Sequence, residues 1–288
     1  MSAERAKVGL VGGRGYVGQE LVKLVARHPR LELAFVASSS KRGEPVAAHL
    51  EGAPAGLRFL DPSAIDYAAT GADVVVLGLA NGEAPPVAAA VAAALPDAVL
   101  VDLGADHRFD DAWVWGVPEL RRRALAGAKR IANPGCYATA AALALAPLAP
   151  LLAGPAHVFG VSGYSGAGAT PSPRNDVALL RDNVMPYALT RHVHEREVSR
   201  HVAPVFFVPH VASFFRGVAV TVSMTFAEPP DEGALRERYR AAYADEPLVA
   251  VVGGPPLVRD LVGTPRAAIG GLAVDAARRH GVVVAALD

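Results

Sequence analysis

The sequence predicts an α/β fold in two domains. Three observations support this prediction. The chain has 288 residues, and a domain usually takes roughly 100–200. The first half alternates short apolar runs with segments of helical spacing, and the second half has strand-like runs without that regular alternation. We expect residues 1–135 to form a parallel sheet covered by helices and residues 136–288 to form a mixed α+β domain.

The first half contains five short apolar runs that we predict as strands. Val/Leu-rich runs that alternate with helices indicate a parallel sheet buried on both faces. Between the strands, Tyr16–Arg27 and Pro86–Leu95 have helical character, and Val17, Leu21 and Leu24 share one helix face. The predicted strands are Lys7–Val11, Leu31–Ala37, Asp73–Leu79, Ala98–Leu103 and Lys129–Ala132.

In the second half, strict alternation from Val218 to Thr225 marks a strand with two different faces. Residues 138–152 and Glu232–Tyr243 are predicted to be helical, the latter capped by Asp231. Residues 162–174 are rich in Gly, Ser and Pro and are predicted to form a loop. The predicted strands are Ala156–Ser162, Val205–Pro209, Gly217–Phe226 and Gly281–Leu287.

Composition excludes several functional classes. Lys plus Arg and Asp plus Glu both total 28, so the sequence predicts neither a nucleic-acid partner nor a polybasic membrane patch. A single cysteine rules out an internal disulfide and fits a reducing compartment. The N-terminus has no signal-peptide pattern, and the apolar stretches are shorter than a membrane span. We therefore expect a cytoplasmic protein without a membrane partner.

A glycine-rich turn follows the first predicted strand and precedes a helix. It consists of Gly12, Gly13, Arg14, Gly15, Tyr16, Val17 and Gly18. Glycines let the backbone turn tightly beside a pyrophosphate, and a helix N-terminus offers free N–H groups and partial positive charge. This context predicts a Rossmann-type dinucleotide-binding domain. The alternative is a plain tight turn.

The end of the second predicted strand bears on which dinucleotide binds. NAD enzymes usually carry an acidic residue there, which binds the ribose hydroxyls. This chain instead has Ser38, Ser39, Ser40, Lys41 and Arg42. Hydroxyls and cations suit a 2′-phosphate, so we predict NADP as the cofactor, with Ser38, Ser39 and Arg42 binding it. An ordinary polar loop is the alternative.

Cys136 follows a Pro-Gly turn and begins an alanine-rich segment. At a helix N-terminus the dipole and the free N–H groups favour the thiolate, which is the nucleophile of covalent acyl chemistry. A buried small residue is the commoner role of a free cysteine. Beside a nicotinamide, a cysteine nucleophile predicts the interconversion of a thioester and a thiohemiacetal.

The segment from Tyr187 to Glu197 is dense in polar residues. A histidine near the thiol, His192 in our interpretation, would serve as acid and base. A zinc site made of His192, His194 and His201 is the weaker interpretation, because no further cysteine accompanies them, and we predict no metal. A solvated charged helix is the other alternative.

Two arginines are candidate anion binders. Arg108 follows the fourth predicted strand, at the sheet edge where ligands bind in such folds. Arg216 precedes a strong strand and could bind a carboxylate bidentately. Each arginine could instead form a structural ion pair.

These features together resemble a known family, the N-acetyl-gamma-glutamyl-phosphate reductases, which belong with the semialdehyde dehydrogenases. The resemblance runs from about Lys7 to Asp288. It rests on residues 133–139 (NPGCYAT), on 162–168 (SGYSGAG) and on Pro209-His210 with Arg216-Gly217. Weaker support comes from 102–108, from 116–120 and from the His192-x-His194-x-x-Glu197 pattern.

The resemblance implies a function and the residues that perform it. Cys136 would attack an acyl phosphate, NADPH would reduce the thioester, and N-acetylglutamate semialdehyde would leave. His192 would act as acid and base, and the family forms homodimers or homotetramers through the second domain. Ser165, Gly166 and Gly168 would contact the cofactor. Substrate contacts would come from Arg108, Asn133, Ser162, Tyr187, His194, Glu197, His210 and Arg216.

Other members of this family continue into a closing helix where this sequence ends, at Asp288, so we expect that helix to be missing here. Sequence alone leaves related acyl groups open, namely aminoadipyl phosphate on a carrier protein, aspartyl phosphate, and a succinyl in place of the acetyl group. A non-catalytic NADP-binding protein is the alternative of a different class.

Overall fold

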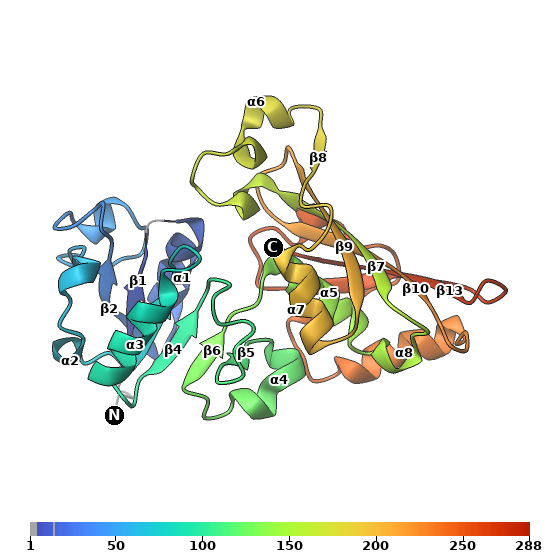
Figure 1. The fold of residues 1–288 in the computed structure, drawn as a ribbon, viewed down its shortest axis with the longest axis horizontal. Coiled ribbons are helices and arrows are strands. Elements are labelled where there is room, and N and C mark those ends of the chain that lie inside the picture. Colours follow the sequence, from blue (N-terminus) through green and yellow to red (C-terminus); the bar gives the residue numbers. More distant parts are fainter. Residues whose placement is uncertain (1–4, 14) are drawn as a thin grey trace. The chain divides into compact units, whose positions relative to one another are not determined.

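The computed structural model describes residues 5–13 and 15–288, shown in Figure 1. The backbone divides into two compact units. Unit 1 consists of Met1–Gly116 and Arg121–Asn133, and unit 2 consists of Val117–Leu120 and Pro134–Asp288.

Unit 1 is built on a six-stranded sheet in the order β2-β1-β3-β4-β6-β5, and every neighbouring pair is parallel. The elements are β1 (Ala6–Val11), α1 (Tyr16–Arg27), β2 (Leu31–Ala37), α2 (Tyr67–Thr70), β3 (Val74–Leu77), α3 (Ala84–Ala94), β4 (Val99–Asp102), β5 (Val114–Trp115), α4 (Pro118–Leu125, which continues from unit 2) and β6 (Arg130–Ala132).

Two apolar clusters cover the two faces of this sheet. On one face Leu10 and Val76 pack with Val22 of α1. On the other face Leu77 packs with Val91 of α3. Successive strand residues therefore point into opposite clusters, which confirms the predicted sheet buried on both faces.

Unit 2 contains a seven-stranded mixed sheet in the order β11-β12-β13-β10-β7-β9-β8. Its pairs are antiparallel except for β7 with β9 and β11 with β12. The elements are α5 (Cys136–Leu145), β7 (Ala156–Gly163), α6 (Val177–Leu180), β8 (Val184–Pro186), α7 (Val193–His201), β9 (Val205–Ala212), β10 (Val218–Thr225), α8 (Glu232–Ala242), β11 (Val249–Val251), β12 (Ala267–Asp275) and β13 (His280–Leu287).

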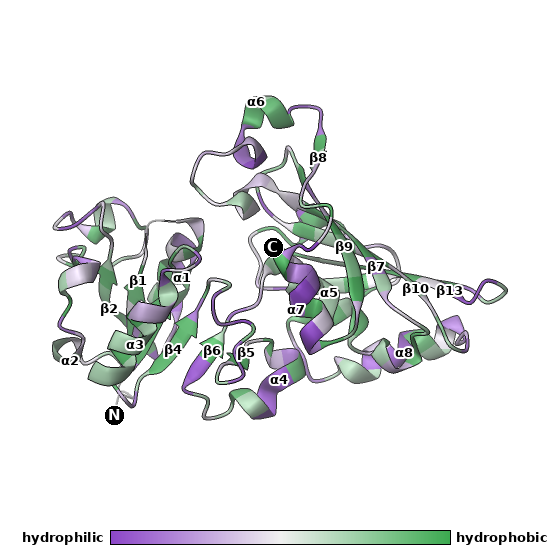
Figure 2. Cartoon of the chain, in the orientation of Figure 1, coloured by the Kyte–Doolittle hydropathy of each residue, from purple (hydrophilic) through white to green (hydrophobic). Residues whose placement is uncertain are grey.

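Helix α5 is the centre of unit 2. It contacts β10, β13 and α7, and almost all of its residues are buried, so its alanines allow the surrounding elements to approach closely. In Figure 2, α5 and β9 are mostly green, whereas α7 shows purple. The hydroxyls of Tyr239 on α8 and of Tyr243, its C-cap, donate to the carbonyls of Ala144 and Leu143 at the C-terminal end of α5. The helix that begins at Cys136 is thus fixed at its far end.

The described residues also contain six short 3₁₀ turns: η1 (Val46–Ala48), η2 (Pro62–Ala64), η3 (Ala149–Leu151), η4 (Tyr164–Ala167), η5 (Pro173–Asn175) and η6 (Val258–Asp260). None of the helices in the described part of the chain combines the length and the apolar composition that crossing a bilayer requires.

The predicted α/β fold is confirmed, and the predicted bounds of α1 and β2 agree with the structure. The Asp231 side chain caps α8 as expected, accepting from the N–H groups of Gly233 and Ala234. Two predictions were wrong in part. The helix predicted at 138–152 ends at Leu145, before Pro147, and the loop predicted at 162–174 contains the turns η4 and η5. Strands β5, β8, β11 and β12 were not predicted.

Candidate active site

The glycines of the turn in unit 1 differ in their surroundings: some are packed so closely that a side chain would collide with other atoms, whereas Gly15 has open space around it. Gly12 has φ +92°, and a side chain there would also collide with the Gly78 carbonyl. A methyl group at Gly18 would lie 2.8 Å from the carbonyl oxygen of Gly13. At Gly15, the N-cap of α1, an added Cβ would meet nothing within 4 Å. The space that a pyrophosphate would need therefore lies at Gly15, at the N-terminal end of α1, where the helix dipole places partial positive charge.

The other predicted residues of this turn have different settings. Tyr16 and Val17 lie on the first turn of α1 and are exposed, while Gly13 packs against Val36. Arg14 lies outside the described residues.

The turn allows a direct test by paired substitutions. Gly15→Ala should cost about 1 kcal/mol of unfolding free energy or less, because Gly15 has φ −82° and open surroundings. Gly12→Ala should cost about 3 kcal/mol or more through strain and overlap. Thermal unfolding measures the difference, and NADPH titration should show weaker binding by the stable Gly15 variant. Unchanged NADPH affinity in that variant would contradict a pyrophosphate at Gly15.

Of the three predicted 2′-phosphate residues after β2, Ser38 and Arg42 already have partners within the protein. Ser38 is buried, and its backbone N–H donates to the Leu60 carbonyl, whereas Ser39 is exposed. Arg42 pairs with Asp61 at 2.9 Å, and two hydrogen bonds from Ser63 together with this arginine lower the pKa of Asp61 to about 2. A 2′-phosphate would have to compete with Asp61 for the guanidinium.

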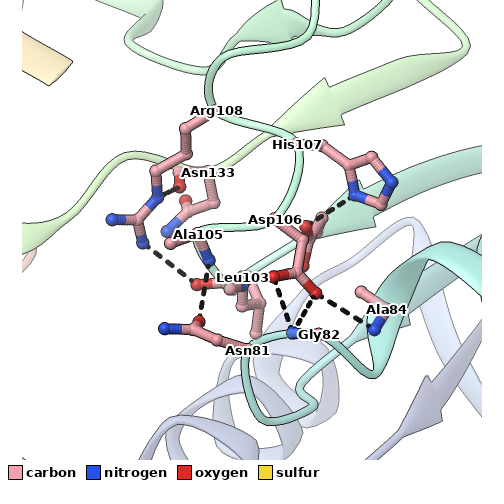
Figure 3. A network of polar contacts seen from close by, with 11 residues as sticks. Asn81, Gly82, Ala84, Leu103, Ala105, Asp106, His107, Arg108 and Asn133 are labelled. Atoms are coloured by element: carbon pink, nitrogen blue, oxygen red, sulfur yellow. Dashed lines mark hydrogen bonds and ion pairs between the residues drawn. The ribbon is translucent and has the colours of Figure 1, made fainter. Parts of the chain in front are cut away.

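Arg108 is held at the carboxyl edge of the sheet by a dense polar network, shown in Figure 3. Its Nε donates to the carbonyl of Asn133 at 2.9 Å and its Nη2 to that of Leu103. The Asp106 carboxylate accepts from the N–H groups of Gly82 and Ala84, which fixes the loop before Arg108. The structure therefore brings the predicted residues Arg108 and Asn133 together.

In unit 2, Cys136 is the first residue of α5 and is partly exposed. The N–H of Gly135, the N-cap, donates to Oε1 of Glu197 at 3.1 Å, and the Glu197 side chain is fully buried. The ring of His194 lies so close to Gly135 that a Cβ at this position would overlap it. His194 and Glu197, predicted as substrate contacts, thus both lie against the turn that presents the thiol.

His192 has a different role in the local structure, because it caps α7 and does not lie within it. The N–H of His194 donates to Nδ1 of His192 at 3.2 Å. Burial, and then the charge of Arg174, lower the pKa of His192 to about 4. A neutral imidazole whose Nδ1 accepts carries its proton on Nε2, so His192 is a hydrogen-bond donor at pH 7.

Tyrosines surround this group. The Tyr137 hydroxyl donates to the His210 carbonyl at 2.5 Å and also interacts with Ser162. Burial raises the pKa of Tyr137 and that of Tyr187. Tyr187 lies edge-on to His192 at 5.6 Å between ring centroids. The predicted residues Ser162 and Tyr187 therefore join the Cys136 group.

Two predicted substrate residues lie elsewhere. The His210 ring lies tilted at 39° to the ring of Phe159, 4.2 Å between centroids, on the same side of the sheet as the exposed Phe206. Arg216 forms a bidentate pair with Asp288, whose side chain is 5% exposed, at 2.8 and 2.7 Å. For Arg216 the geometry fits the alternative of a structural ion pair.

The loop predicted to contact the cofactor is anchored at both ends. The N–H of Ser165 donates to the Phe215 carbonyl, and the Gly168 carbonyl accepts from Asn175. Gly166 lies between these anchors, within η4, with Ser162 as its nearest neighbour.

Comparison with known proteins places the chain. Residues 7–128 match the family model "Semialdehyde dehydrogenase, NAD binding domain", and residues 136–288 match "Semialdehyde dehydrogenase, dimerisation domain". An N-acetyl-gamma-glutamyl-phosphate reductase of Xanthomonas euvesicatoria pv. vesicatoria is 50% identical over all of this chain and 92% of its own length. The chain belongs to the N-acetyl-gamma-glutamyl-phosphate reductase family of semialdehyde dehydrogenases. The resemblance found in the sequence is thereby confirmed.

Another reductase of this name, from Stenotrophomonas maltophilia, is 51% identical over 98% of the chain and 89% of its own length. Solved structures share the fold. Aspartate semialdehyde dehydrogenase II of Vibrio cholerae, complexed with ASA, superposes with a TM-score of 0.79 at 18% identity over 99% of this chain and 94% of that one. The Candida albicans aspartate semialdehyde dehydrogenase with NADP gives 0.74 at 16% identity, over 99% and 94%.

Sequence reasoning missed the contributions of Gly135 and Tyr137. Both lie inside the recognised motif around Cys136, but their roles depend on contacts with α7 and β9. It also missed Arg174, which lies over the Tyr187 ring at 5.1 Å. Its only sequence signal is a Pro-Arg-Asn turn at the end of a Gly-rich loop.

Proposed function

We propose that this protein reduces N-acetyl-gamma-glutamyl phosphate to N-acetylglutamate 5-semialdehyde, releasing phosphate, in arginine biosynthesis. The observation that carries the proposal is Cys136 at the start of α5, with His194 and Glu197 packed against its turn, in a chain 50% identical to reductases of that name.

The chemistry begins with the Cys136 thiolate, which the N-terminal end of α5 stabilises. Sulfur attacks the acyl carbonyl, the bond from carbon to the phosphate oxygen breaks, and a thioester forms. The nicotinamide cofactor, when bound, supplies the hydride. The carbon–sulfur bond then breaks and the thiolate is regenerated.

We assign the proton transfer to His194 and not to His192, the residue first predicted. Two contacts support this choice. The His194 ring lies against Gly135, next to Cys136, and the Nδ1 of His192 already accepts from the backbone. We propose that His192 uses its Nε2–H to stabilise the carbonyl oxygen as negative charge develops there. In that case His194→Ala should alter the pH profile of kcat. His192→Ala should lower kcat but leave the apparent pKa values of that pH profile unchanged.

We propose residues 1–135 as the NADP-binding domain and residues 136–288 as the catalytic and oligomerisation domain. The open space at Gly15 and the positive end of the α1 dipole fit a pyrophosphate. We further propose a cytoplasmic location, since the single cysteine and a biosynthetic role suit that compartment.

Cofactor choice can be tested at Arg42. Arg42→Gln should raise the KM for NADPH about tenfold and leave the KM for NADH unchanged, because only NADPH carries a 2′-phosphate for the guanidinium to bind. Steady-state kinetics with both cofactors measure this. An equal change for the two cofactors would contradict the assignment.

We propose a homodimer formed through the open face of the unit 2 sheet. Phe159 on β7 and Phe206 on β9 are exposed to 46% and 55%, and the family model for this unit is named for dimerisation. Phe206→Asp should therefore give monomers in size-exclusion chromatography with light scattering. A dimer that persists in this variant would rule out this face.

The reverse reaction tests the whole proposal. Semialdehyde, phosphate and NADP should yield NADPH only when phosphate is present. If the cofactor binds without turnover, the acyl group is a different one, and a panel with aspartyl and aminoadipyl semialdehydes identifies it. If the cofactor does not bind, the dinucleotide site itself is refuted.

A further inference from the structure

Arg174 is held in a rigid turn of unit 2. It lies in η5, where the Ser172 N–H donates to Oδ1 of Asn175 at 2.7 Å. The Asn175 amide donates in turn to the carbonyls of Gly168 and Thr170, at 2.8 and 2.7 Å. One side chain thus ties the turn to the loop that starts at Ser162, so the position of the Arg174 backbone is fixed.

The guanidinium of Arg174 extends toward the Cys136 group. Its carbon lies 5.1 Å from the centroid of the Tyr187 ring, within cation–π range. The charges of both Cys136 and Arg174 act on the pKa of Tyr187, the thiolate raising it and the arginine lowering it. Arg174 therefore lies within electrostatic reach of the residues that surround the thiol.

Arg174 has no carboxylate partner within 4.0 Å among residues 5–13 and 15–288, and it is exposed. Two carboxylates in its surroundings bind backbone groups: Asp176, two residues on, and Glu195, which like Arg174 acts on the pKa of His192. Asp176 accepts from the N–H groups of Ala178 and Leu179, and Glu195 accepts from that of Phe207 at 2.9 Å. Arg216, by contrast, is paired with Asp288.

An N-acylated glutamyl phosphate is anionic at both ends. The guanidinium of Arg216 is already paired with Asp288, so it does not serve either anion directly. We propose that Arg174 binds an anionic group of the substrate, its carboxylate or its phosphate, through a charge-assisted hydrogen bond. This inference rests on the proposed function and adds a binding residue to it. The Tyr187 ring orients the planar guanidinium, and Asn175 holds the turn.

The reverse reaction separates the two anions, because the semialdehyde carries the carboxylate and phosphate is a separate substrate. Arg174→Gln should raise one of the two KM values about tenfold or more, with kcat changed less than about threefold. A raised KM for the semialdehyde identifies the carboxylate, and a raised KM for phosphate identifies the phosphate. Arg181→Gln, an exposed arginine that follows α6, is the matched control and should change neither value. If Arg174→Gln also changes neither, the inference is overturned.

A second measurement does not depend on the substrate. Iodoacetate is an anion and iodoacetamide is neutral, and both alkylate a thiolate. A cation that recruits anions to Cys136 should raise the alkylation rate with iodoacetate relative to the rate with iodoacetamide. Arg174→Gln should lower this rate ratio about threefold or more, and Arg181→Gln should leave it unchanged. An unaltered ratio in Arg174→Gln overturns the inference even in a protein that turns over no semialdehyde. If Arg174→Gln lowers the rate ratio but the unaltered protein turns over no semialdehyde, the proposed substrates are refuted and the anion site at Arg174 stands.

Discussion

Replacing Cys136 by serine is expected to lower kcat at least about a thousandfold, since a serine hydroxyl is not ionised at neutral pH and its alkoxide is a poor leaving group from the adduct. The helix dipole at the start of α5 favours a thiolate but cannot ionise an alcohol. The assay is phosphate-dependent NADPH formation from the semialdehyde. The serine side chain is smaller than that of cysteine and the position is partly exposed, so the variant should fold normally.

The control for this variant is cofactor binding, which depends on the glycine turn of unit 1 and not on sulfur. NADPH should bind Cys136→Ser with the affinity of the unaltered protein. A serine variant that keeps more than about a tenth of the activity would refute the thioester, because no other described residue in the group offers an equivalent nucleophile.

The alternation of strands and helices in unit 1 was predictable because each buried parallel strand is a continuous apolar run bounded by a turn. Strand β12 shows where this reasoning fails. Its sequence from Ala267 contains Gly270 and Gly271, which look like a turn, and the register with β13 shifts there. A side chain at Gly270 would overlap the backbone of Gly254, so the close approach of a distant segment requires this glycine.

The candidate site was predictable where local sequence determines it. A Pro-Gly turn before an apolar segment was enough to place Cys136 at a helix N-terminus. The roles of His192 and His194 depended instead on the residue at which α7 begins, since Val193 as first helical residue makes His192 a cap. The pairing of Arg216 with Asp288 joins residues 72 apart in sequence, and no local pattern indicates such a contact.

The second large effect is expected at Gly135, where an alanine should lower kcat about a hundredfold, because small displacements of reacting groups cost that much. The backbone of Gly135, at φ −73° and ψ 153°, is one that alanine adopts without strain. The whole effect therefore comes from the new methyl group, which would overlap the His194 ring. Either His194 or the turn that carries Cys136 has to move.

Stability and activity separate in this variant. Overpacking at one position should cost about 1–3 kcal/mol, so calorimetry should show a fall in Tm that leaves the protein folded at the assay temperature. Gly154→Ala is the matched control, because Gly154 is exposed and an added Cβ there would meet nothing within 4 Å. If Gly135→Ala kept the turnover of the unaltered protein, the close contact between His194 and the cysteine turn would have no part in proton transfer, and the role would return to His192.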